Sequence, residues 1–365
     1  MIRLTWFIVA SFLAASAQAE VLKSSQGALQ LTRMADGFDV PWAIGFLPGG
    51  GVLVTDLNGK LFYVIGKKKQ LIKGVPRVVA RGQGGLLDVM VPRDFANSRE
   101  IFLTFSIRQN RGSGTALAVA KLSSDFKRLR NLRVIFEASP SSSTSRHYGS
   151  RVIEAQDGSL FMTLGERGES ETAQDLSSHQ GSVIRLNRDG SAPIDNPYVN
   201  VSHAQKHIWS YGHRNPQGLA LDRRGSIWAV EHGAQGGDEI NRIQKGANYG
   251  WPIISYGRHY SGARIGEGTS KPGMQQPSWY WDPSIAPSGM MIYSGELWPD
   301  WRGHFFVGSL KFDYISRLSG RNLMEEERLK GPYTGRIRDV VEAPDGSIWF
   351  ASETDGAVYR LSPSR

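Results

Sequence analysis

Residues 157–161 read DGSLF, residues 224–228 read RGSIW and residues 345–350 read DGSIWF. Each stretch joins a glycine and a polar residue to a short run of β-branched or aromatic side chains, which is typical of a turn leading into a β-strand. The glycines at positions 158, 225 and 346 are separated by 67 and 121 residues, and the second interval is about twice 60, as a repeated unit requires. A fourth copy, GGVLV, begins at residue 50. The repetition indicates a series of similar small sheets.

Six units of about 58 residues fill the chain after residue 19, which fits a six-bladed β-propeller of four-stranded antiparallel blades. No long stretch keeps a helical period of 3.6 residues, and no Gly/Ser-rich linker divides the chain. We therefore expect an all-β fold with a single domain over residues 20–365. Seven shorter blades or a large sandwich stay open as alternatives, because the repeat is degenerate and no Trp-Asp signature marks each blade.

The composition is that of an ordinary globular protein. Hydrophobic residues make up 40% of the chain and charged residues 21%, so there is too little polarity for a disordered protein. The chain contains no cysteine. This excludes a disulfide-stapled fold, a thiolate zinc site and a cysteine nucleophile.

The first 19 residues have the pattern of a cleavable secretory signal. Arg3 supplies the positive charge, residues 4–15 form an apolar stretch, and Ala17-Gln18-Ala19 is a small-x-small cleavage site. A membrane anchor needs about 20 apolar residues, and polar residues interrupt this shorter segment. We expect a mature protein that begins at Glu20, is periplasmic or secreted, and does not insert stably into a membrane.

The charge balance is basic, at +9 for the chain, and removal of Arg3 with the signal would leave one positive charge fewer. A basic protein can bind nucleic acid. The only dense basic run is Lys67-Lys68-Lys69, however, and export argues against such a partner. We interpret the charge as a solvated basic surface and expect no nucleic-acid partner.

In a propeller, ligand sites usually lie where the loops between strands converge at one end of the central channel. Five loops have an unusual polar content, and Lys311 follows an apolar strand at residues 305–307. The loops are residues 81–85 (RGQGG), 145–149 (SRHYG), 213–218 (HRNPQG), 231–239 (EHGAQGGDE) and 335–339 (GRIRD).

Four longer stretches containing or extending these loops carry a specific resemblance. They are residues 82–88 (GQGGLLD), 210–218 (SYGHRNPQG), 237–241 (GDEIN) with 248–252 (NYGWP), and 336–340 (RIRDV). Their ordered combination resembles the soluble aldose sugar dehydrogenases that depend on pyrroloquinoline quinone (PQQ), which are related to the soluble quinoprotein glucose dehydrogenases. The resemblance runs from about residue 38 to the C-terminus.

The resemblance implies a set of PQQ-binding residues. PQQ is a planar quinone with three carboxylates, and arginine forks bind carboxylates in a bidentate way. Gln83, Asn215 and Lys311 are implied at the quinone edge, and Arg336 and Arg338 at the carboxylates or the ring. The implied binding set also contains Arg214, Tyr260, Ser309, Leu310 and Ile337. Without the resemblance, Arg336 and Arg338 would be interpreted as a solvated stripe on one strand face.

His147 is the predicted general base. Oxidation of an aldose at the anomeric carbon requires removal of the hydroxyl proton, and a histidine near its ordinary pKa suits that task. The resemblance implies the same role for His147 and implies that Glu166 orients it, as a third group should. The alternatives are a structural histidine and a Glu166 carboxylate paired with Arg167 or Arg151.

The acidic loop at residues 231–239 indicates a calcium site, because calcium binds carboxylate and carbonyl oxygens. The resemblance implies that the main-chain carbonyls of Gly233 and Ala234 hold a calcium ion that bridges to PQQ. Ala234 departs from the family, which usually has proline there, and the loss of a fixed φ would soften the site. Glu239, through its carboxylate, and Tyr249, through its carbonyl, match a second, structural calcium site. The alternative for Glu239 is an ordinary hairpin end.

The resemblance thus implies an enzyme that oxidises aldose sugars to lactones, with hydride transfer to bound PQQ and release of electrons to an acceptor. The preferred aldose is not determined by the sequence, and the loops between residues 255 and 285 are the expected source of the choice. Two other functions stay open. A calcium-dependent lactonase would not need the cationic cluster, and a glycan-binding propeller would need neither that cluster nor His147.

Overall fold

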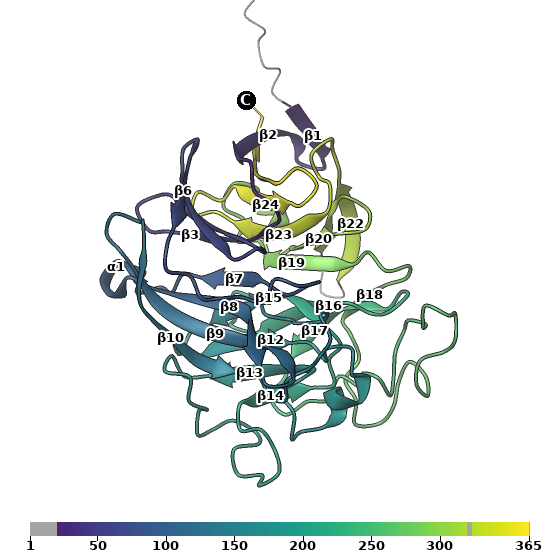
Figure 1. Cartoon of the computed structure of the whole chain (residues 1–365). Helices are drawn as coiled ribbons and strands as arrows, with labels where there is room; N and C mark the ends of the chain where they lie inside the picture. Colours follow the sequence, from purple (N-terminus) through teal and green to yellow (C-terminus); the bar gives the residue numbers. More distant parts are fainter. Residues whose placement is uncertain (1–19, 320–322, 365) are drawn as a thin grey trace, which may run out of the picture.

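The computed structural model describes residues 20–319 and 323–364, and the predicted signal segment lies outside them. In these residues, twenty-five strands form six antiparallel sheets around a central axis, with almost no helix (Figure 1). The prediction of a six-bladed propeller is therefore confirmed, and the seven-bladed and sandwich alternatives are wrong.

Five blades are four-stranded, and each is a meander of consecutive strands. From the innermost to the outermost strand, they are β3 (Pro41–Phe46), β4 (Val52–Asp56), β5 (Lys60–Ile65) and β6 (Lys68–Ile72); β7 (Leu86–Met90), β8 (Glu100–Gln109), β9 (Gly112–Leu122) and β10 (Leu129–Glu137); β11 (Val152–Glu154), β12 (Leu160–Leu164), β13 (Ser182–Leu186) and β14 (Ile208–Tyr211); β15 (Pro216–Leu221), β16 (Ile227–Glu231), β17 (Asp238–Ile243) and β18 (Trp279–Trp281); and β19 (Pro287–Ile292), β20 (Phe305–Ser309), β21 (Ile315–Ser319) and β22 (Met324–Leu329).

The sixth blade joins both ends of the described chain. Strands β23 (Ile337–Glu342), β24 (Ile348–Ser352) and β25 (Ala357–Pro363) continue into β2 (Gly27–Ala35) and β1 (Glu20–Ser24). The junction is the antiparallel pairing of β2 with β25, in which Leu29 lies opposite Pro363. The innermost strands β23 and β3 also contact each other, so the ring is closed.

The repeated glycine turns occupy one structural position. Those at residues 158, 225 and 346 join the first and second strands of the third, fourth and sixth blades. In two of them, the aspartate before the glycine accepts hydrogen bonds from a following serine, as in Asp157 with the Ser159 amide at 2.9 Å and hydroxyl at 2.6 Å. The corresponding connections hold helix α1 (Phe95–Ser98) in the second blade and helix η2 (Pro299–Trp301) in the fifth. These insertions explain why the repeat is degenerate.

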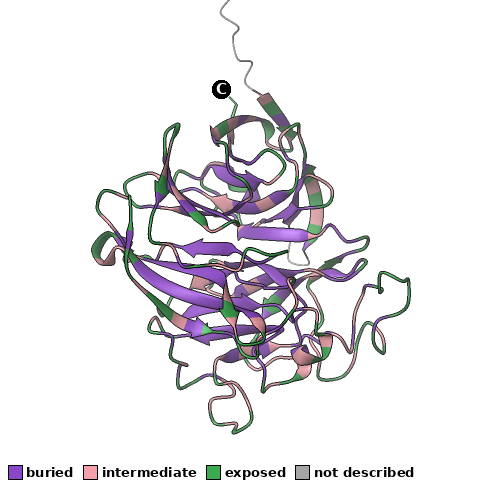
Figure 2. Cartoon of the chain, in the orientation of Figure 1, coloured by how far each residue is buried: buried purple, intermediate pink, exposed green. Residues whose placement is uncertain are grey.

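The hydrophobic core lies between neighbouring blades, where buried strands pack face to face (Figure 2). One buried cluster, for example, joins Leu53 and Leu61 of the first blade to Leu103 of the second. The exposed residues lie mainly in turns and outer strands (Figure 2). Rigid strands therefore fix the positions from which the loops at each end project.

Candidate active site

The candidate site lies at one end of the propeller. Gln83, His147 and Asn215 come shortly before the innermost strands β7, β11 and β15, and Glu166, His232 and Leu310 follow the second strands β12, β16 and β20. Because the first two strands of a blade are antiparallel, the start of one lies beside the end of the other. The topology thus brings loops from separate parts of the sequence together.

A cavity of about 360 Å³ opens among these loops. It has a mixed polar and apolar lining from all six blades, consisting of Val40, Trp42, Leu57, Gly82, Gln83, Leu87, Tyr148, Gly149, Asn215, Gln217, His232, Ala286, Leu310, Arg336, Arg338 and Glu353. A lining of this kind, with a few convergent polar groups, is typical of a small-molecule site.

His147 is held beside this cavity by two contacts. Its Nδ1 lies 2.6 Å from Oε2 of the buried Glu166, and its main-chain amide donates to Oε1 of Gln83 at 2.7 Å. Its φ of 54° is in the left-handed region, which is uncommon outside glycine and marks a constrained position. Burial lowers the pKa of His147, and Glu166 acts in the opposite direction.

The Glu166 carboxylate pairs with His147 rather than with Arg151 or Arg167. Arg151 pairs with Asp88 and Asp339, and the Arg167 guanidinium donates to the carbonyls of Arg146 and Ser113. An ionised carboxylate can only accept hydrogen bonds. The contact therefore assigns the imidazole proton to Nδ1 and leaves Nε2 as a hydrogen-bond acceptor. The arrangement is that of a base held by a carboxylate.

His232 is a second histidine at the cavity, and the sequence analysis missed it. Its Nε2 donates to the carbonyl of Pro287 at 2.6 Å. Burial and the nearby Arg214 lower the pKa of His232 to about 3. A group with this pKa is a poor proton acceptor at neutral pH, so His147 is the better candidate base.

Arg336 and Arg338 face the cavity together. Both pair with Glu353, Arg336 at 2.8 Å; the Arg338 side chain is 14% exposed and that of Arg336 is 52% exposed. Burial alone would raise the pKa of Glu353, but the two arginines outweigh it and lower that pKa. Two cations against one carboxylate leave a positive excess at the cavity, which suits an anionic ligand.

Amide side chains also belong to the cavity lining. Gln83 and Asn215 both line the cavity, and Asn215 Oδ1 accepts hydrogen bonds from the Gly149 amide at 3.1 Å and from Gln217 at 3.2 Å. Arg214 does not line this cavity but lines a smaller one beside Glu231, and its guanidinium carbon is 5.2 Å from the ring centroid of Trp251. Within residues 20–319 and 323–364, its buried Nε has no hydrogen-bond partner, a polar atom that a bound anion would satisfy.

The remaining predicted cofactor residues are more scattered. Leu310 lines the cavity, Lys311 is an exposed neighbour, and the hydroxyl of Ser309 donates to Ile285. The side chain of Ile337 packs in the hydrophobic core, and Ile337 does not line the cavity. Tyr260 is not brought to the cavity, because it is 79% exposed in a hairpin of the loop between β17 and β18.

The predicted calcium loop is tightly folded. A Cβ added at Gly233 would lie 2.1 Å from the carbonyl oxygen of Gly236, so only glycine fits there. Ala234 is buried in a small cluster with Ala173, Trp251 and Ile265. Packing against these side chains therefore restrains the main chain at Ala234, as the rigid ring of a proline would do.

Glu239 and Tyr249 share a second cavity of about 20 Å³ with Glu231. This is enough for one water molecule or one small ion. Burial raises the pKa of Glu239 to about 8, and the charge of Glu231 adds to the effect. Two carboxylates in so small a space fit a cation.

In the part of the chain that the structure describes, no group of three or more His, Cys, Asp or Glu side chains has an arrangement suited to a metal ion. A calcium site here would therefore depend on main-chain carbonyls, which is how the resemblance assigns Gly233, Ala234 and Tyr249. Within the same residues, no helix has the length and apolar character of a membrane span.

Sequence reasoning also missed Gln217, Glu231 and Glu353. Gln217 and Glu231 stand inside loops that the analysis singled out, so their position beside Asn215 and Gly233 was a usable signal. Glu353 had no such signal in the sequence, because residues 352–356 (SETDG) have the composition of an ordinary turn. Its role emerges only from the ion pairs with Arg336 and Arg338.

Comparison with known proteins identifies relatives over most of the chain. Residues 38–360 match the family model described as glucose/sorbosone dehydrogenase. The aldose sugar dehydrogenase YliI of Escherichia coli is 41% identical over 340 residues, covering 90% of this chain and 92% of that protein.

Solved structures show the same fold. The apo-form of the soluble aldose sugar dehydrogenase from E. coli superposes with a TM-score of 0.89 at 40% identity, covering 92% of this chain and all of that one. The PQQ-bound form of an aldose sugar dehydrogenase from Streptomyces coelicolor gives a TM-score of 0.75 at 25% identity, covering 92% and 98%. The chain described here therefore belongs to the glucose/sorbosone dehydrogenase family.

Proposed function

We propose that the protein is a PQQ-dependent aldose sugar dehydrogenase, which oxidises an aldose at the anomeric carbon to the lactone. The observation that carries this proposal is the cavity that Arg336 and Arg338 line together with Gln83 and Asn215, with the His147–Glu166 pair beside it. A relative is named aldose sugar dehydrogenase, and a solved relative is PQQ-bound. The lactonase alternative gives no role to the cations, and a glycan-binding role gives none to His147.

The residues fit the cofactor by their chemistry. Arg336 and Arg338 would bind its carboxylates, Gln83, Asn215 and Lys311 would contact its quinone edge, and Gly233 and Ala234 would hold the bridging calcium. When bound, PQQ would supply the acceptor for the hydride that leaves the anomeric carbon. Arg214, Leu310 and the main chain at Ser309 and Ile337 would complete the pocket.

His147 would accept the proton of the anomeric hydroxyl at Nε2. Glu166 holds the Nδ1 proton, so the ring keeps one orientation and one tautomer. Burial keeps the imidazole neutral at neutral pH because it lowers the pKa of His147. As the proton arrives, the Glu166 carboxylate would stabilise the resulting imidazolium.

We further propose that residues 20–365 form one catalytic domain, exported to the periplasm or secreted after cleavage of the signal. An electron acceptor, a quinone or a small redox protein, would complete the turnover. Tyr260 and the loops between residues 255 and 285 would set the choice of aldose, and Tyr260 would line the sugar approach.

Reconstitution tests the assignment. Purified protein without cofactor should be inactive, and addition of PQQ with calcium should give aldose-dependent reduction of an artificial electron acceptor. The reason is that the protein binds and orients the sugar and the cofactor, whereas the quinone accepts the hydride. Stoichiometric binding should be visible in the quinone absorbance after gel filtration. Lack of PQQ binding in calcium, or activity with a nicotinamide cofactor alone, would reject the proposal.

The second calcium site is tested by thermal stability. Calcium that binds only the folded protein should raise the melting temperature by mass action, and Glu239→Gln should reduce that rise because it removes one carboxylate of the small cavity. The experiment is best run without PQQ, when the bridging ion should bind weakly. Glu267→Gln, at an exposed carboxylate that pairs with Lys271, is the matched control. An unchanged rise in the Glu239 variant would mean that Glu239 is not a ligand.

A further inference from the structure

Three residues that line the cavity sit at the same unusual backbone position. In the innermost strands β3, β15 and β23, the pairing register shifts between the first and third residues, so that Trp42, Gln217 and Arg338 are bulged. A bulged residue is left out of the regular ladder, and its carbonyl needs another donor. All three side chains line the cavity.

Arg151 supplies donors to two of these carbonyls. It lies directly before β11, the innermost strand of the third blade. Its Nε donates to the carbonyl of Gln217 at 2.8 Å, and its Nη2 donates to the carbonyl of Arg338 at 3.1 Å. Its guanidinium carbon is 4.3 Å from the ring centroid of Trp42. One side chain thus contacts all three bulged residues, yet it does not line the cavity.

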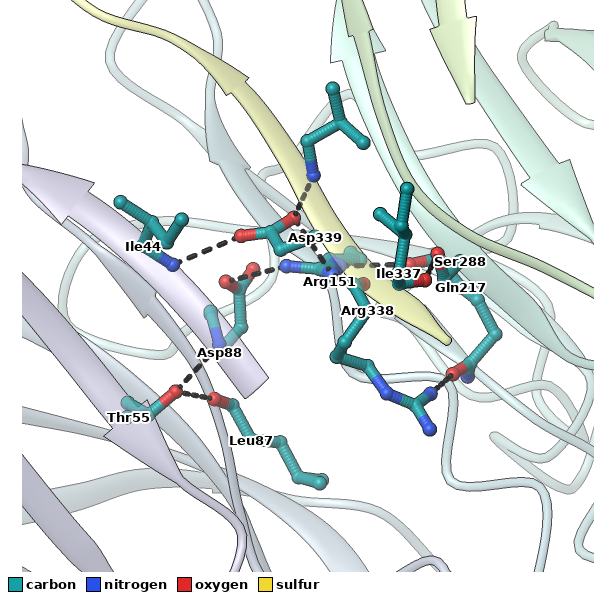
Figure 3. A network of polar contacts seen from close by, with 12 residues as sticks. Ile44, Thr55, Leu87, Asp88, Arg151, Gln217, Ser288, Ile337, Arg338 and Asp339 are labelled. Carbon is teal, nitrogen blue, oxygen red and sulfur yellow. Dashed lines mark hydrogen bonds and ion pairs between the residues drawn. The ribbon is translucent and has the colours of Figure 1, made fainter. Parts of the chain in front are cut away.

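Two aspartates hold the guanidinium in this position (Figure 3). Asp88 and Asp339, from β7 and β23, lie 3.3 Å and 2.9 Å from its Nη1 and Nη2. These carboxylates are themselves fixed by main-chain amides, Asp88 by Val152 at 2.8 Å and Asp339 by Ile44 at 2.9 Å. The charge of Arg151 is therefore compensated, and its orientation is fixed by four blades.

The two residues held by Arg151 also contact each other. Nη1 of Arg338 lies 3.4 Å from Oε1 of Gln217 (Figure 3). The Gln217 amide in turn donates to Asn215 and to the carbonyl of Gly149. A displacement of either bulge would therefore move the arginine and the amide that face the cavity. Lysine cannot take over this role, because it lacks the planar fork of donors.

We propose that Arg151 is a positioning residue, which fixes the bulged main chain of Gln217 and Arg338 so that their side chains face the cofactor. The inference rests on the proposed function for the identity of the ligand. The positioning itself can be tested without any cofactor.

The test compares Arg151→Lys with Arg185→Lys. Arg185 is the matched control, because it is also buried, pairs with Asp157 and Asp195 at 2.8 Å each, and stacks on Trp209 at 5.2 Å from the ring centroid. It contacts no residue of the cavity lining. Both substitutions should lower the melting temperature, so both variants are measured well below their transitions.

Amide hydrogen exchange in the cofactor-free proteins is the first readout. Arg151→Lys should accelerate exchange about tenfold in peptides spanning residues 215–219 and 336–340, and Arg185→Lys should leave these peptides unchanged. Binding of PQQ in the presence of calcium is the second readout, by isothermal titration calorimetry. The dissociation constant should rise about tenfold or more for Arg151→Lys and stay within about twofold for Arg185→Lys.

Unchanged exchange in both peptides, or equal PQQ affinity for the two lysine variants, would overturn the inference. If the wild-type protein binds no PQQ, the proposed function fails, but the exchange experiment still decides whether Arg151 positions the bulges. If Arg151→Lys does not fold, Asp88→Asn replaces it. That variant loses one anchor of Arg151, and the same two peptides should exchange faster by a smaller factor.

Discussion

His147→Gln should bind PQQ as the wild-type protein does but turn over aldoses about 10²- to 10⁴-fold more slowly, which is the usual contribution of a positioned base. The imidazole has a carboxylate partner at 2.6 Å and a free acceptor nitrogen, and glutamine has no titratable group to replace it. The measurement is kcat with an artificial acceptor at full cofactor occupancy, checked by quinone absorbance.

His203→Gln is the control for this prediction, because His203 is exposed in a loop away from the cavity lining. It should keep wild-type turnover. If His147→Gln also keeps it, another base must act, and His232 would be the next residue to replace. Its Nδ1 is the only other imidazole nitrogen that the described cavity lining offers as an acceptor.

Arg338→Ala should weaken PQQ binding by about 10²-fold, because truncation of one partner of a buried charged contact typically costs several kcal/mol. The loss has two sources. The cofactor would lose a bidentate donor, and Glu353 would keep only Arg336, so the cavity would lose its positive excess. The dissociation constant of PQQ in calcium, from titration calorimetry, is the measurement.

Arg360→Ala is the matched control for Arg338→Ala. Arg360 also pairs with a carboxylate, Asp345 at 2.7 Å, but that pair lies at the turn between β23 and β24, at the opposite end of the sixth blade. Its removal should leave the affinity for PQQ unchanged. Equal affinities for the wild-type protein and Arg338→Ala would show that the cofactor carboxylates are held elsewhere.

The fold could be predicted largely from local patterns. The glycine turns at 158, 225 and 346 recur because each joins the first two strands of a blade, and the longer interval of 121 residues spans the fifth blade, where helix η2 replaces the turn. The pairing of β2 with β25 was not predicted. Strand pairing across the whole chain depends on geometry that neither strand encodes by itself.

The site could be predicted only in part from the residues themselves. The contact of His147 with Glu166 joins two loops of one blade and followed from the resemblance. The bulges at Gln217 and Arg338 have no reliable sequence signature, because a bulge arises from a mismatch between two paired strands. Arg151 was considered only as an alternative partner for Glu166. Its true partners, Asp88 and Asp339, belong to other blades, and the structure was needed to find them.

The shared sixth blade also constrains the order in which the protein can fold during synthesis. Its outer strands β1 and β2 are synthesised before the other described strands, whereas β25, which links them to the rest of the sheet, is synthesised after them. Contacts between residues so distant in the chain are slow to form. The nascent chain must therefore carry five blades with an open edge until β25 has been synthesised. In that interval it depends on protection against aggregation, since unpaired strand edges are prone to wrong pairings.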